Sequence, residues 1–242
     1  MSLSRRSFLG ASVSLAALPA LGKVKEKAQA LRIGVIGAGW LGGTVGRVWV
    51  RAGHEVLFSS RHPEELAAMA RELGPRASVG TPREAAGFGS VVLFAVPYAA
   101  LPQLGRDLRE ALRGKVVLDA CNPSASSDDA LAREALAHGV GPTSAKYLPS
   151  TRLVRAFSAV DATEVEASAA RQSGKLAVPL AGDDAEAVQV AARLVRDAGC
   201  EPLVLGKLSE ASRFQRGSPG FRANTTMMEL RRRLGMPAQE KP

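Results

Sequence analysis

The sequence is poor in the residues that build metal centres and disulfide frameworks. It has two cysteines, Cys121 and Cys200, and its three histidines are scattered at His54, His62 and His138. Two cysteines cannot form a tetrahedral cysteine site or a disulfide framework. No two histidines have the spacing of a metal-ligand pair. We therefore expect no metal site, and no arrangement of nucleophile, histidine and carboxylate that would supply catalytic residues.

Long apolar runs and aromatic residues are scarce as well. No segment reaches the roughly 20 apolar residues of a membrane helix, so we expect no integral membrane span. The 46% hydrophobic and 23% charged residues exclude a disordered chain and a coiled coil, and 242 residues suit one α/β domain with a small appendage. The net charge is +9, but no basic stretch is interleaved with aromatics, so we expect no nucleic-acid partner.

The first 30 residues have the pattern of a targeting signal. Arg5 and Arg6 precede a Phe-Leu pair, a moderately apolar run follows, and three lysines come after it. This order resembles a twin-arginine export signal, with an ordinary basic leader as the alternative. Cleavage is expected after Ala30, or else after Gly22. We therefore expect residues 1–30 to be a signal peptide, and the protein to be periplasmic or otherwise extracytoplasmic.

From residue 31 the chain alternates between short apolar strands and helical segments. A strand over 31–36 leads into a glycine-rich turn, a helix over 43–52 and a second strand over 55–59. This is a βαβ unit around the G-x-G-x-x-G pattern, in which the helix N-terminus and the open backbone receive a pyrophosphate. The predicted phosphate-binding residues are Gly37, Ala38, Gly39, Trp40, Leu41 and Gly42.

The end of the second strand indicates which nucleotide binds. Sites that prefer NAD usually place a carboxylate here on the ribose 2′-hydroxyl. This chain has Ser60 and Arg61 instead, and no carboxylate before Glu64. A guanidinium makes charge-assisted bonds to a 2′-phosphate. We therefore expect NADP(H) as the cofactor, with Ser60 and Arg61 at its 2′-phosphate.

Further strands and helices continue the alternation to residue 213. They predict an α/β fold of Rossmann type, with a doubly wound, mostly parallel sheet and a short C-terminal helical tail. The oxidoreductase domain is expected over 31–213 and a basic tail over 214–242. Ligands of such sheets lie at the carboxyl ends of the strands, which puts Val96, Pro97 and Asn122 beside the nucleotide.

Several segments together resemble one protein family. They read IGVIGAGWLG at 33–42, AGHEVLFSSR at 52–61, FAVPYAALP at 94–102, GKVVLDACNP at 114–123 and LGKLSEASR at 205–213. The chain resembles the coenzyme F420-dependent NADP oxidoreductases, whose nucleotide domain is related to that of pyrroline-5-carboxylate reductase. The resemblance implies direct hydride transfer between NADPH and a flavin or deazaflavin such as F420, with Val96 and Pro97 on the nicotinamide side.

Two positions differ from the family pattern. Ser158 stands where relatives have Asn, and Trp40 is bulkier than the usual residue. Two other functions therefore remain open: an imine or 2-hydroxyacid reductase on the same nucleotide domain, and a non-catalytic exported NADP-binding subunit. The expected partner is a small-molecule redox acceptor, and a homodimer is left open.

Overall fold

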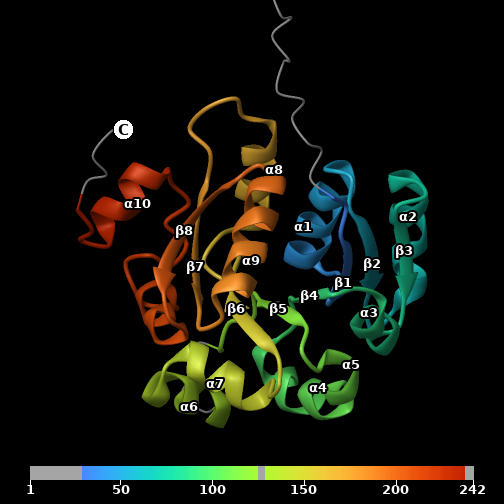
Figure 1. The fold of residues 1–242 in the computed structure, drawn as a ribbon, viewed down its shortest axis with the longest axis horizontal. Coiled ribbons are helices and arrows are strands. Elements are labelled where there is room, and N and C mark those ends of the chain that lie inside the picture. The colour runs from blue at the N-terminus through green and yellow to red at the C-terminus, as the bar shows by residue number, and fades with distance from the viewer. Residues whose placement is uncertain (1–28, 125–128, 238–242) are drawn as a thin grey trace, which may run out of the picture.

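One sheet runs through the part of the protein that the computed structural model describes, residues 29–124 and 129–237. Within these ranges its eight strands lie in the order β3-β2-β1-β4-β5-β6-β7-β8 (Figure 1). The strands are β1 (Arg32–Ile36), β2 (Glu55–Ser59), β3 (Ala77–Gly80), β4 (Val91–Phe94), β5 (Val116–Asp119), β6 (Arg152–Arg155), β7 (Ala177–Gly182) and β8 (Glu201–Gly206).

The sheet is parallel except at one place. β6 and β7 pair in antiparallel fashion, with Val154 opposite Gly182 and Arg155 opposite Ala181, whereas every other pair of neighbours is parallel. The predicted Rossmann-type, mostly parallel sheet is therefore confirmed. Because β1, β4, β5 and β6 point the same way, their carboxyl ends meet at one edge, called here the carboxyl edge.

Helices cover both faces of the sheet, as a doubly wound fold requires. Figure 1 shows α1, α8 and α9 on one face and α4 to α7 on the other. Each face has its own buried core: Trp49, Val165 and Leu194 lie in one, and Leu101 and Leu148 lie in the other. The α-helices are α1 (Trp40–Arg51), α2 (Ala67–Leu73), α3 (Pro82–Phe88), α4 (Leu101–Asp107), α5 (Arg109–Leu112), α6 (Ala130–His138), α7 (Val140–Tyr147), α8 (Ala162–Ala170), α9 (Ala185–Asp197) and α10 (Met227–Arg233). Short 3₁₀ segments are η1 (Pro63–Leu66), η2 (Tyr98–Ala100) and η3 (Leu208–Phe214).

Local sequence signals set several helix ends. Thr81 and Glu84 form a capping box at the start of α3, and Asp184 is the N-cap of α9. The segment between β4 and β5 forms three short pieces, η2, α4 and α5. The helices α7 and α8 have no counterpart in the sequence-based prediction, and the hydrophobic patterning of α8 is weak.

The C-terminal segment packs on the sheet. Phe214, at the end of η3, is fully buried, and Leu230 of α10 packs with Ala177 and Leu203. The expected helical tail is therefore present and contributes to a small core beside β7 and β8. Among the described residues, no helix combines the length and hydropathy needed to cross a membrane.

Candidate nucleotide and acceptor site

The phosphate loop joins β1 to α1 and leaves the start of that helix open. Gly39 is the N-cap of α1, and no side chain of the described residues caps the helix. The backbone N–H groups of Gly37 and Ala38 are used elsewhere, since both donate to the carbonyl of Ser59 on β2, at 3.1 and 2.8 Å. An uncapped helix start offers unpaired N–H groups and the positive end of the helix dipole, which together suit an anion.

The three glycines of the loop are needed for different reasons. Gly37 has a φ of +94°, and a Cβ there would lie 2.5 Å from the carbonyl oxygen of Ala95. A Cβ on Gly42 would lie 2.3 Å from the carbonyl oxygen of Gly37, so the helix can approach the strand only without one. A Cβ on Gly39 would meet nothing within 4 Å. Two glycines thus permit packing, and the third keeps open the space beside the helix N-terminus.

The end of β2 presents an unpaired cation beside this loop. Arg61 is exposed and has no hydrogen-bond or ion-pair partner among the described residues. Ser60 is half-buried, and its hydroxyl accepts a bond of 2.8 Å from the backbone N–H of His62. The imidazole of His62 lies 3.5 Å from Glu64, an exposed pair. The first carboxylate after β2, that of Glu64, therefore lies beside His62.

The end of β4 lies against the phosphate loop. A Cβ on Gly37 would be 2.7 Å from Cγ1 of Val96, so these two segments are in close contact. Val96 is half-buried and Pro97 is exposed. Trp40 is 75% exposed at the start of α1, so its indole is free to cover a ligand at the loop. All ten predicted cofactor residues lie on this loop or at the ends of β2 and β4.

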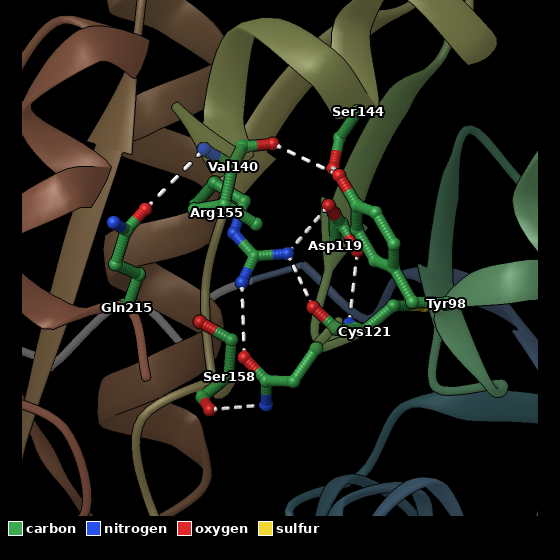
Figure 2. Close-up of polar contacts among 9 residues, drawn as sticks. Tyr98, Asp119, Cys121, Val140, Ser144, Arg155, Ser158 and Gln215 are labelled. Atoms are coloured by element: carbon green, nitrogen blue, oxygen red, sulfur yellow. Dashed lines mark hydrogen bonds and ion pairs between the residues drawn. The ribbon is translucent and has the colours of Figure 1, made fainter. Parts of the chain in front are cut away.

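A buried ion pair joins the ends of β5 and β6, and the sequence analysis did not identify it. Asp119 and Arg155 are register partners on neighbouring strands. Both are fully buried, with 2.6 Å between Oδ2 of Asp119 and Nη1 of Arg155 (Figure 2). A charged residue ends each of two adjacent apolar strands, at 119 and 155, and that pattern is the signal that could have revealed the pair.

The guanidinium of Arg155 also holds the backbone beyond β5. Its Nη1 donates to the carbonyl of Cys121 at 2.6 Å, and the second carboxylate oxygen of Asp119 accepts from the N–H of Cys121 at 2.9 Å. Burial, with Asp119 nearby, raises the pKa of the Cys121 thiol well above its ordinary value. Cys121 is therefore a buried, protonated side chain and not a reactive thiolate.

Asn122 connects this pair to the loop after β6. Its Nδ2 donates to the carbonyl of Ser158 at 2.7 Å, and its Oδ1 accepts from Nη2 of Arg155 at 3.3 Å. Ser158 is buried, and its hydroxyl has no hydrogen-bond partner within residues 29–124 and 129–237. Phe157 before it has a φ of +60°, which a non-glycine residue rarely adopts. Such strain persists only where the surroundings over-determine the backbone.

A buried phenol borders the same network. The hydroxyl of Tyr98, just after Pro97, donates to the carbonyl of Val140 at 3.2 Å and lies 3.1 Å from the hydroxyl of Ser144 (Figure 2). Burial raises the pKa of Tyr98 above its ordinary value. Tyr98 therefore stays protonated and acts as a structural bridge to α7.

The other titratable groups do not gather at the carboxyl edge. Lys146 and Tyr147 both bind Glu134 on α6, on the surface of the α6–α7 pair. His54 pairs with Asp197 of α9 at the start of β2, away from this edge. Among the described residues, no group of three His, Cys, Asp or Glu side chains is arranged to hold a metal ion.

Comparisons with known proteins fit the arrangement at this edge. Residues 32–123 match one oxidoreductase family. Its description is "NADP oxidoreductase coenzyme F420-dependent". The matched part runs from β1 to just after β5, so it contains the phosphate loop, the ends of β2 and β4, and Asn122. The match supports an NADP-dependent oxidoreductase.

One curated relative is similar over a longer stretch. The chain is 28% identical over 190 residues to the metalloreductase STEAP3 of Rattus norvegicus, a stretch that covers 76% of this chain. The match covers 35% of the relative, so the chain spans about a third of that protein's length. The similarity therefore concerns one portion of the larger protein.

Solved structures share the fold. A hypothetical protein from Sinorhizobium meliloti superposes with a TM-score of 0.66 at 22% identity, over 81% of this chain and 95% of that one. A putative F420-dependent NADP reductase from Arthrobacter sp. FB24 has a TM-score of 0.61 at 22% identity, over 76% and 88%. An imine reductase from Myxococcus stipitatus has a TM-score of 0.57 at 16% identity, over 76% and 57%. At these identities the likeness concerns the fold.

Proposed function

We propose that this protein binds NADP(H) at the carboxyl edge of its sheet and transfers hydride between that cofactor and a flavin or deazaflavin acceptor. The observation that carries the proposal is the open phosphate loop beside an unpaired arginine. The start of α1 is uncapped, Gly39 leaves space beside it, and Arg61 has no partner among the described residues. An anion with a second phosphate nearby suits this pair of features.

The choice of NADP(H) over NAD(H) rests on the end of β2. A site for NAD needs an acceptor there for the ribose 2′-hydroxyl. Ser59 is buried and its hydroxyl donates to the carbonyl of Val35 at 2.9 Å, while Ser60 and Arg61 follow it. The exposed guanidinium is the group able to bind a phosphate dianion in a forked geometry.

The choice of a flavin or deazaflavin as acceptor rests on the side chains that lie at the carboxyl edge. Its buried acid, Asp119, is paired with Arg155, and the backbone N–H and carbonyl of Cys121 are bound by these two side chains. The thiol of Cys121 is buried and protonated. NADPH supplies hydride directly to an electron-poor ring, and the protein's part is then to orient two rings and exclude water. The edge supplies apolar groups such as Val96, Pro97 and Trp40, which suit that task.

Purified protein, mixed with NADPH and a panel of acceptors, tests the proposal. The panel contains FMN, coenzyme F420, a cyclic imine and a 2-oxo acid, and oxidation is followed by the nicotinamide absorbance. Turnover with FMN or F420 supports the proposal. Turnover with only the imine or the oxo acid indicates a reductase of those substrates, and NADPH binding without turnover indicates a non-catalytic NADP-binding subunit.

We further propose that the protein is exported in folded form. Arg5 and Arg6 lie outside the described residues, so the proposal rests on the sequence pattern alone. The twin-arginine receptor reads the guanidinium pair and not mere charge. Replacing both arginines with lysine should retain the protein in the cytoplasm, as fractionation and N-terminal sequencing would show. Equal export of the variant would overturn the proposal.

A further inference from the structure

A buried histidine joins the residue before β1 to the end of α9. His54 is 3% exposed, and its Nδ1 accepts a hydrogen bond of 3.0 Å from the backbone N–H of Leu31. Because Nδ1 is the acceptor, the ring proton of the neutral imidazole lies on Nε2, which donates to Oδ2 of Asp197 at 3.0 Å. Leu31 is half-buried and packs against the core that contains Trp49. The N–H of Leu31 is therefore bonded to a side chain that is itself held in place.

The same helix also holds the backbone two residues earlier. Nη2 of Arg193 donates to the carbonyl of Gln29. On the other side, the carbonyl of Leu31 accepts from the N–H of Glu55 at 2.9 Å, next to the first pair of β1 and β2. The peptide bond between Ala30 and Leu31 thus lies between backbone groups that are bonded to the folded domain, although Ala30 is exposed.

This bond is the first of the two at which the sequence predicts removal of the signal peptide. A protease binds the residues around the bond it cuts as an extended strand, so their backbone groups must be free. In a folded protein, cleavage therefore follows the fraction of molecules in which the segment is open. Opening this segment separates the N–H of Leu31 from His54 and leaves a buried ring nitrogen without its donor, which is unfavourable. Since we propose export in folded form, these contacts are formed before the signal peptide is removed.

We propose that His54 and Arg193 protect the bond after Ala30, and that the signal peptide is removed upstream, after Gly22. Gly22 lies outside the described residues, and it is the other cleavage position that the sequence predicts. Hydrolysis there by one water leaves a carboxylate on the signal peptide and a new α-amino group on the mature protein. The mature protein then keeps residues 23–30, with three lysines, ahead of β1. The inference rests on the proposed export, and it names the bond that is cut.

The N-terminus of the exported protein gives the first test. Protein purified from a cell-envelope fraction is sequenced from its N-terminus, and its intact mass is measured. We expect it to begin at Lys23. A start at Leu31 would show that the bond after Ala30 is cut and would overturn the inference. Envelope protein that still begins at Met1 would overturn it as well, because nothing is then removed at Gly22.

Digestion of the purified full-length chain with thermolysin tests the protection without export. Thermolysin cuts before large apolar residues, so the bond before Leu31 is a substrate once its backbone is free. A synthetic peptide of residues 25–34 supplies the rate for a free backbone. The native protein should release the fragment that begins at Leu31 at least about tenfold more slowly than the peptide, as mass spectrometry of timed samples would show. Equal rates would contradict the protection.

Variants of the two protecting side chains identify the contacts. His54→Ala removes the acceptor for Leu31 and should raise the rate of this cleavage by roughly two- to tenfold, the range for one hydrogen bond. His54→Asn keeps an acceptor close to the position of Nδ1, so it should stay nearer to the native rate. Arg193→Ala should also raise the rate, and it decides the test if the His54 variants do not fold. Arg196→Ala is the matched control in the last turn of α9, because the Arg196 guanidinium is exposed and has no hydrogen-bond or ion-pair partner among the described residues.

The fragment pattern separates local opening from general instability. A variant opened only at this segment should release one stable fragment that begins at Leu31, whereas a generally unstable one is cut throughout the domain. If neither protecting-residue variant is cut faster at this bond than Arg196→Ala, these contacts do not protect it, and the inference is wrong whether or not export occurs. If the chain is found only in the cytoplasm with Met1 at its start, the export proposal fails, while the digestion still decides the protection.

Discussion

The ion pair between Asp119 and Arg155 should dominate the response of this protein to mutation. Asp119→Leu leaves the guanidinium fully buried with two neutral acceptors, the carbonyl of Cys121 and the amide of Asn122. Removing one partner of a buried pair typically costs about 3–5 kcal/mol, because the remaining charge is uncompensated. For a chain of this size that loss corresponds to a fall of about 6–20 °C in melting temperature.

Guanidinium denaturation followed by circular dichroism measures this loss. The double variant Asp119→Leu with Arg155→Met removes both charges, so it should be more stable than Asp119→Leu alone and recover at least half of the loss. The exposed pair between Glu110 and Arg113 is the matched control, with an N–O distance of 2.9 Å. Glu110→Gln should change the free energy of unfolding by less than about 1 kcal/mol.

Two results would refute the reasoning. If Asp119→Leu loses no more than the surface control Glu110→Gln, the buried charge is not being compensated by this pair. If the double variant is as unstable as the single one, packing around Asp119 accounts for the loss and the charge does not.

Other predictions concern the cofactor loop and pH. Arg61→Ala should weaken NADPH binding by about 1.5–3 kcal/mol and leave NADH binding little changed, as calorimetry would show; equal native affinity for both would contradict it. Gly39→Val should abolish NADPH binding with the melting temperature preserved, because its Cβ meets nothing, whereas Gly37→Val should lower the melting temperature because of its φ of +94° and the nearby Ala95 carbonyl. Burial lowers the pKa of His54 below 6.5, although the bond to Asp197 opposes this shift. The stability contributed by neutral His54 should thus be complete above pH 6.5 and be lost as the pH falls through the lowered pKa. Denaturation of the native protein and of His54→Gln across this range tests it, and parallel curves would exclude His54 as the source.

The main strands of the fold could be predicted from the sequence, because the patterns that indicate them are local along the chain. The strand expected over 55–59 is β2 with the same bounds, and the capping box of α3 is formed by residues three apart in the chain. The helices α7 and α8 were missed because tertiary contacts shape them more than periodicity does. In α8, Val165 is fully buried, and neighbouring α1 packs against that helix.

The candidate site was predictable only in part, because only some of its contacts join residues that are close in sequence. The phosphate loop follows from spacing along the chain, and its residues lie where that spacing puts them. The pair of Asp119 and Arg155 joins residues 36 positions apart, and it becomes visible only once β5 and β6 are known to be neighbours in register. The orientation of Asn122 depends on that pair, so it too required three-dimensional structure.

Three costly features of this protein lie together at the carboxyl edge, which is an argument for function there. A fully buried ion pair, a non-glycine residue with positive φ and a buried hydroxyl with no partner in the described part of the chain occur between Asp119 and Ser158, on two adjacent strand ends. Each is unfavourable for folding taken alone. Phe157 is nevertheless fixed, since its ring is fully buried and packs edge-on against Trp49 with centroids 5.8 Å apart. A ligand is oriented by groups that do not move when it binds. Because the strained backbone at Phe157 is held in place by packing, it meets this requirement at the carboxyl edge.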